Sequence, residues 1–176
     1  EFLPVSSSGH LEITRELLST NQLPSDNLLM TSVLHFATAL STILVFRKDI
    51  YDLIKGLFDK ENKTSKSYVI KILIAIVPAG LVGFLLSDEI EFLFSGNMTL
   101  VGIMLIITGT LLFLTKILKT KNFKISKVHA LIIGLSQAFA VIPGISRSGA
   151  TICTSLFLGN NKSEAAKFSF LIVIPV

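Results

Sequence analysis

Three long apolar stretches constrain the fold of this chain more than any other feature of its sequence. They cover residues 28–46, 68–86 and 98–118, and each is close to the ~20 residues that an α-helix needs to cross a bilayer. Only 16% of the 176 residues are charged, whereas a soluble domain of this size carries more charge. The sequence therefore predicts an all-α integral membrane protein, with these stretches as spans of a single transmembrane helix bundle over residues 1–176.

The charged residues between the apolar stretches predict on which side of the membrane each loop lies. Lysine and arginine gather in residues 47–67 and 116–127, whereas residues 87–97 carry acidic charges alone. By the positive-inside rule the first two loops are expected in the cytoplasm and the third outside. The net charge of +4 is spread over loops between apolar runs, which argues against a nucleic-acid partner.

Two further segments, residues 1–18 and 130–159, are interrupted by proline, glycine and serine. Each is expected to form two half-helices joined by a polar loop at membrane depth, which is tolerated where protein or a water-filled cavity surrounds the loop. The loop assignments place their entries on opposite faces of the membrane, and residues 4–9 resemble residues 143–149. We therefore predict two re-entrant segments that are related as an inverted repeat, with the site where their loops meet.

The second of these loops has the features of an anion site. Pro143 and Gly144 stop one helix, and Ser146 is a good N-cap for the next, whose first amides and dipole favour an anion. Arg147 lies in that first turn, where a cation opposes the helix dipole, and its charge is costly at membrane depth. A phosphate would offset both costs because a guanidinium binds it in a bidentate manner. The alternative is a structural pair between Arg147 and a carboxylate such as Glu1.

The first loop gathers a carboxylate, three hydroxyls and an imidazole within residues 1–10. Glu1 is expected either to hold a hard divalent cation or to orient a base. A serine hydroxyl beside His10 is the minimal arrangement for an activated nucleophile, although His10 is also able to attack phosphorus itself. Outside the loops, His35 is expected to be structural, and Gln137 either donates to phosphate or bridges two helices.

Both loops closely resemble the two signature motifs of the undecaprenyl-diphosphate phosphatase family, the bacitracin-resistance proteins. The matching runs are EFLPVSSSGHL at residues 1–11 and PGISRSGAT at residues 143–151, and the resemblance continues in order along the whole chain. It implies hydrolysis of undecaprenyl diphosphate to undecaprenyl phosphate and inorganic phosphate, which recycles the lipid carrier for cell-wall synthesis and confers bacitracin resistance. It also implies dependence on Mg²⁺ or Ca²⁺, and a multi-pass protein of the bacterial cytoplasmic membrane with its site open to the external face.

The positions in these motifs also imply roles for single residues. Glu1 is expected to be catalytic and to hold the metal, Ser7 and His10 match the nucleophile and base region, and Arg147 matches the phosphate-binding arginine. The residues expected to bind the substrate are Ser6, Ser8, Gly9, Gln137, Ser146, Ser148, Gly149 and Thr151. The family's first motif has another glutamate upstream of Glu1, so we expect this sequence to be an internal fragment of a longer chain that lacks its N- and C-terminal parts.

The sequence is compatible with several alternatives. A serine nucleophile, a histidine nucleophile and direct attack by water are all compatible with these residues. A transporter or flippase for an anionic polyprenyl lipid would use similar broken helices, and an acid phosphatase with a histidine nucleophile shares part of the motifs. The expected partners are the polyprenyl diphosphate lipid, membrane lipids and, in a homodimer, a second copy of the chain.

Overall fold

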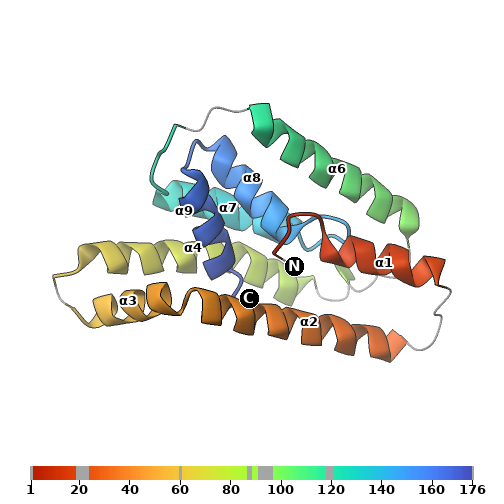
Figure 1. The fold of residues 1–176 in the computed structure, drawn as a ribbon, viewed down its shortest axis with the longest axis horizontal. Coiled ribbons are helices and arrows are strands. Elements are labelled where there is room, and N and C mark those ends of the chain that lie inside the picture. The colour runs from red at the N-terminus through yellow and green to blue at the C-terminus, as the bar shows by residue number, and fades with distance from the viewer. Residues whose placement is uncertain are drawn as a thin grey trace.

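The structure of the chain, a computed structural model, is all-helical over the residues that it describes (Figure 1). These residues are 2–18, 24–59, 61–86, 89–90, 97–117 and 121–175, without the side chains of Arg15 and of residues 24–32. The helices are α1 (Ser7–Leu17), α2 (Pro24–Val45), α3 (Arg47–Phe58), α4 (Lys63–Leu85), α6 (Met98–Ile117), α7 (Lys127–Phe139), α8 (Arg147–Phe157) and α9 (Lys162–Leu171). No β-strand occurs within the described ranges, so the predicted all-α class is confirmed.

Helices α4 and α6 are long and apolar enough to cross a membrane, with 23 and 20 residues. They lie where the sequence predicts spans, and α2 covers most of the range expected for the first span. Only 11% of the most apolar window of either α4 or α6 is buried, so large side chains such as Phe84 and Ile106 are exposed. A soluble protein rarely exposes so large an apolar surface, and lipid is the solvent that suits it.

The most extensive helix contact among the described residues joins α4 to α7. A Cβ added at Gly134 would lie 2.5 Å from the carbonyl oxygen of Ala75. The two helix backbones are therefore closer together than a residue larger than glycine at position 134 would allow. Small residues produce such close approaches between membrane helices because packing, rather than the hydrophobic effect, drives their association. Ala75 and Ile133 belong to a buried cluster that also includes Phe168 of α9.

The two loops that the sequence singles out lie near the centre of the molecule. The predicted segment 130–159 contains most of α7 and all of α8, with the non-helical residues 140–146 between them. In the first segment, the loop at residues 2–6 leads directly into α1. Helices α1 and α8 begin close together and run away from one another, while α6 packs against both (Figure 1).

Polar contacts fix the position of α9 at the side of the bundle. Lys167 of α9 forms an ion pair with Asp49 of α3. Asn160, in the turn between α8 and α9, is fully buried and bonds through its Oδ1 to Nδ1 of His129 on α7, at 2.8 Å. These contacts hold α9 in place, and α9 carries Phe170 on the side of the two loops.

Candidate active site

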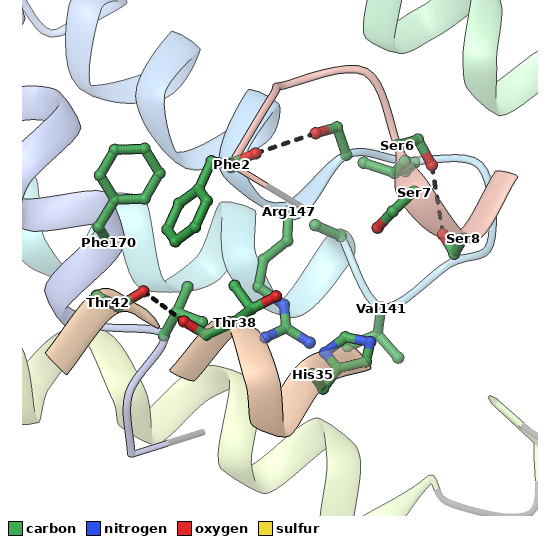
Figure 2. Close-up of a pocket in the computed structure, with 15 residues that line it drawn as sticks. Phe2, Ser6, Ser7, Ser8, His35, Thr38, Thr42, Val141, Arg147 and Phe170 are labelled. Atoms are coloured by element: carbon green, nitrogen blue, oxygen red, sulfur yellow. Dashed lines mark hydrogen bonds between the residues drawn. The ribbon is translucent and has the colours of Figure 1, made fainter. Parts of the chain in front are cut away.

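A cavity of about 200 Å³ lies where the two loops meet α2 and the end of α9 (Figure 2). This volume has room for several water molecules or a diphosphate head group but not for a long prenyl chain. The cavity is lined by Phe2, Ser6, Ser7, Ser8, His35, Thr38, Thr42, Ala140, Val141, Ile145, Ser146, Arg147, Ser148, Phe170 and Val173.

Ser6 fixes the start of α1 at one side of this cavity. Its Oγ accepts a hydrogen bond from the Gly9 amide at 3.2 Å and lies 3.3 Å from Oγ of Ser8. The φ of Ser6 is 62°, in the left-handed region that a residue other than glycine adopts only when its surroundings hold it there. The cap therefore sets the turn that places Ser7 and Ser8 in the wall of the cavity.

Ser146 repeats this arrangement at the start of α8, where the sequence predicts it as the N-cap. Its Oγ accepts from the Gly149 amide at 3.0 Å and lies 3.3 Å from Oγ of Ser148. Thr108 of α6 holds this loop, because its Oγ1 donates to the carbonyl of Gly144 at 3.2 Å and accepts from the amide of Ser146 at 3.2 Å. Both α1 and α8 thus begin at the cavity. The positive ends of their helix dipoles favour an anion there.

The two loops pack against each other through glycine. A Cβ at Gly9 would lie 3.1 Å from Cα of Gly144, and a Cβ at Gly149 would lie 3.1 Å from the carbonyl oxygen of Pro4. Gly144 has a φ of +94° and approaches the backbone of Val101 on α6, so glycine is required there. Gly9 and Gly149, expected from the sequence to bind substrate, lie at this contact rather than in the lining of the cavity.

Arg147 is the first residue of α8, and its guanidinium extends into the cavity toward α2 (Figure 2). A cation at this end of a helix opposes the dipole at a cost of about 0.3–1 kcal/mol, and removal from water adds to that cost. An anion in the cavity would offset both. Ser7 lines the same cavity from α1, so the structure brings together the arginine and the serine that the sequence assigns to catalysis.

Helix α2 supplies a third polar wall. His35, Thr38 and Thr42 recur at the spacing of one helix face, and all three line the cavity. Thr42 is buried, with 1% of its surface exposed, and its Oγ1 donates to the carbonyl of Thr38 at 2.8 Å. The sequence predicts a structural role for His35, whereas the structure places it in this wall. The polar spacing within the apolar span is the signal that could have found it.

The remaining wall of the cavity is apolar. The ring of Phe2 meets the ring of Phe170 edge to face, with centroids 5.4 Å apart, and Phe46 lies 6.0 Å from Phe170. Val173 and Val141 extend this surface. The cavity therefore offers cationic and hydroxyl groups on one side and aromatic and aliphatic groups on another, which suits a ligand with an anionic head and an apolar tail.

Besides Gly9 and Gly149, three other expected site residues do not line the cavity. His10 has an exposed side chain, and its Nδ1 lies 2.8 Å from the carbonyl oxygen of Ser6. Thr151 is buried behind Arg147, where its hydroxyl bonds to Ser169 and to the Arg147 carbonyl. Gln137 is also buried, at 2% exposure, and neither of its amide atoms has a hydrogen-bond partner among the described residues.

The divalent cation that the resemblance implies depends on Glu1, which lies outside the described residues. Within the described part of the chain, no group of three or more His, Cys, Asp or Glu side chains is arranged to hold a metal ion. Among the described residues, those that line the cavity offer hydroxyl groups but no carboxylate. The described donors alone thus do not fit the oxygen-rich, charged coordination of Mg²⁺ or Ca²⁺.

Comparison with known proteins places this site in a family. The family model described as bacitracin resistance protein BacA matches residues 1–176. An undecaprenyl-diphosphatase of Christiangramia forsetii is 52% identical over 176 residues, which cover 100% of this chain and 67% of that protein. A protein of the same name from Bacteroides fragilis is 47% identical, over 99% of this chain and 65% of its own length.

The similarity extends to relatives of lower identity. An undecaprenyl-diphosphatase of Methanococcus vannielii is 41% identical over 180 residues, which cover 100% of this chain and 70% of that protein. The chain thus spans about two thirds of the length of the curated relatives that it matches. Since a model of the family matches every residue, the chain belongs to the bacitracin resistance protein BacA family.

Proposed function

We propose that this chain is the catalytic part of an undecaprenyl-diphosphate phosphatase, which hydrolyses undecaprenyl diphosphate to undecaprenyl phosphate and inorganic phosphate. The observation that carries the proposal is one cavity lined by Arg147, by serines of two helix N-termini and by an aromatic wall. The relatives' name, undecaprenyl-diphosphatase, supports the same reaction and does not favour the transporter alternative. The activity would recycle the lipid carrier for cell-wall synthesis and confer bacitracin resistance.

Binding would depend on the charge distribution of the cavity. Arg147 would grip one phosphoryl group with its bidentate fork, and the dipoles of α1 and α8 would add to the positive potential. The first carbons of the prenyl chain would lie against Phe2 and Phe170, and the rest of the chain would extend into lipid. Phosphoryl transfer needs mainly positioning and stabilisation of charge on the phosphoryl oxygens, and both are contributions that these residues are able to make.

Two routes of attack on phosphorus agree with this geometry. In the first, Ser7 attacks the terminal phosphorus, the bond to the bridging oxygen breaks, and undecaprenyl phosphate leaves; water then hydrolyses the phosphoserine and releases inorganic phosphate. In the second, a water molecule attacks the terminal phosphorus directly, and undecaprenyl phosphate leaves as inorganic phosphate forms. His10 would serve as the base in either route: its Nδ1 faces a carbonyl oxygen, so the neutral ring carries its proton there and Nε2 is the acceptor. Because His10 does not line the cavity, its proton transfer would require the substrate or a water molecule to bridge the gap.

A divalent cation, Mg²⁺ or Ca²⁺, is the cofactor that we propose for this reaction, with Glu1 as its ligand. When bound, such an ion would neutralise charge on the phosphoryl oxygens. The support is the position of Glu1 in the motif, directly before the loop whose residues 6–8 line the cavity. Another carboxylate would have to complete its coordination, because the described lining of the cavity supplies none.

The proposed setting is the bacterial cytoplasmic membrane, with several spans and with the cavity open to the external face. The inverted repeat is part of this proposal. It is supported by the same Ser-x-Ser-Gly hydrogen-bond pattern in both loops and by the reciprocal contacts of Gly9 with Gly144 and of Gly149 with Pro4. Loops at membrane depth would be protected here by α6, which packs over both α1 and α8. A homodimer remains a prediction.

A phosphate-release assay tests the proposed function. The complete protein, purified in detergent, is incubated with a C55 prenyl diphosphate and with Mg²⁺ or Ca²⁺, and inorganic phosphate is measured over time. We expect turnover by the parent protein and a loss of about 100-fold or more in Arg147→Ala. A parent protein that binds the lipid but releases no phosphate would contradict the phosphatase and favour the transporter.

A further inference from the structure

His35 is a polar side chain of the cavity that the two loop motifs do not account for. It lies on α2, outside both loops, and its imidazole points toward the guanidinium of Arg147 across the cavity (Figure 2). Its side chain is half-buried, in a span whose other described faces are mostly apolar and exposed. A polar residue within an apolar span, facing a cavity, is a functional candidate because lipid would make it costly elsewhere.

The neighbours of His35 on α2 are poorly suited to bind an anion. Thr38 donates its hydroxyl proton to the carbonyl of Leu34 at 2.9 Å, and Thr42 donates to the carbonyl of Thr38 at 2.8 Å. With these protons committed to the helix backbone, the two hydroxyls present lone pairs to the cavity rather than donors. An imidazole has two ring nitrogens, so His35 is able to direct an N–H into the cavity even when its other nitrogen is engaged.

The charge of the expected ligand gives this donor a role. Among the described residues that line the cavity, Arg147 alone carries a permanent charge. A diphosphate presents two phosphoryl groups, and one guanidinium fork matches the oxygens of one of them. The second group needs a donor on another wall, and the wall opposite Arg147 is α2.

We propose that His35 is a substrate-contacting residue that binds the second phosphoryl group of a diphosphate, while Arg147 binds the first. This assignment rests on the proposed function for the identity of the substrate. It makes His35 a specificity determinant: the residue strengthens binding of a diphosphate and contributes little to binding of a monophosphate or of inorganic phosphate. The lipid product, which retains one phosphoryl group, would then leave the cavity readily.

Inorganic pyrophosphate and inorganic phosphate are the probes for this contact. Their dissociation constants are measured by calorimetry on the complete parent protein and on His35→Ala, without added prenyl lipid. Loss of a hydrogen bond to a charged group should weaken pyrophosphate binding about 10-fold or more in His35→Ala. Phosphate binding should change less than about threefold, because Arg147 and the helix N-termini remain in place.

Two further variants separate a contact from a structural role. His35→Gln keeps an N–H donor near the same place, so it should recover most of the pyrophosphate affinity. Phe36→Ala is the matched control on α2, because Phe36 is 67% exposed and does not line the cavity; it should bind both probes as the parent does. If His35→Ala weakens both probes equally, or if His35→Gln recovers nothing, the role is structural and the proposal fails.

The remaining outcomes also decide between the two proposals. A parent protein that binds pyrophosphate more tightly than His35→Ala but releases no phosphate from the lipid would contradict the phosphatase and leave the His35 contact standing. Phosphate release by the parent, with pyrophosphate affinity unchanged in His35→Ala, would overturn the His35 contact and leave the phosphatase. A parent that binds no pyrophosphate at all would also count against the contact.

Discussion

Thr108 offers a sharp test of how α6 holds the second loop. This residue is 3% exposed, and its hydroxyl both donates to the carbonyl of Gly144 and accepts from the amide of Ser146, each at 3.2 Å. Thr108→Val keeps the shape of the side chain and removes both hydrogen bonds. The Ser146 amide and the Gly144 carbonyl then lose a partner in a buried place.

The expected loss of stability follows from the number of contacts removed. Hydrogen bonds between membrane helices contribute about 0.6 kcal/mol on average and about 1.7 kcal/mol at most. Two such contacts give an expected loss of about 1–3 kcal/mol in the free energy of unfolding. Activity should fall about 10-fold or more, because Ser146 caps the helix that presents Arg147 and a small displacement misplaces the guanidinium.

The assay is thermal unfolding in detergent together with the phosphate-release rate. Thr110→Val is the matched control on the same helix: the Thr110 hydroxyl is exposed and donates to the carbonyl of Ile106 at 2.8 Å, within α6 itself. Thr108→Ser, which keeps a hydroxyl, should retain most of the activity. If Thr108→Val unfolds at the same temperature as Thr110→Val and hydrolyses the lipid at the parent rate, α6 does not position the loop.

Three other predictions address packing, chemistry and the cation. Gly134→Val should lower the free energy of unfolding by about 1–3 kcal/mol, because its Cβ would lie 2.5 Å from the Ala75 carbonyl, whereas Gly80→Val, with nothing within 4 Å, should unfold like the parent. Ser7→Ala should abolish phosphate release if serine is the nucleophile, and a rate near that of the parent would exclude serine as the nucleophile. Removal of divalent cations with a chelator should stop phosphate release, and added Mg²⁺ or Ca²⁺ should restore it; unchanged turnover after chelation would exclude the cation at Glu1.

The loops of this site were largely predictable from the sequence because their chemistry is local. Pro143, Gly144 and Ser146 interrupt and then restart a helix within a few residues, and the structure shows the N-cap at Ser146. The apolar stretches likewise predict helices α4 and α6 because length and composition alone are sufficient for that purpose. Features that depend on near neighbours in the chain are thus the ones that were predicted.

The α2 wall was not predicted because it depends on how a long helix is rotated about its axis. His35, Thr38 and Thr42 share a face, but the sequence does not say whether that face meets a cavity or another helix. Gln137 shows the same dependence, because only the packing of α7 reveals an amide that is buried without a partner among the described residues. Contacts between distant segments, such as that of Thr108 with Gly144, carry no local pattern that would predict them.

The bidentate grip of Arg147 on a phosphoryl group is the claim on which the proposed chemistry depends. The most direct measurement compares kcat/KM for release of phosphate from a C55 prenyl diphosphate by the parent and by Arg147→Lys. Lysine keeps the charge but not the planar fork, so we expect kcat/KM to fall about 100-fold. A value for Arg147→Lys within about twofold of the parent would contradict this account, because a point charge would then serve as well as the fork.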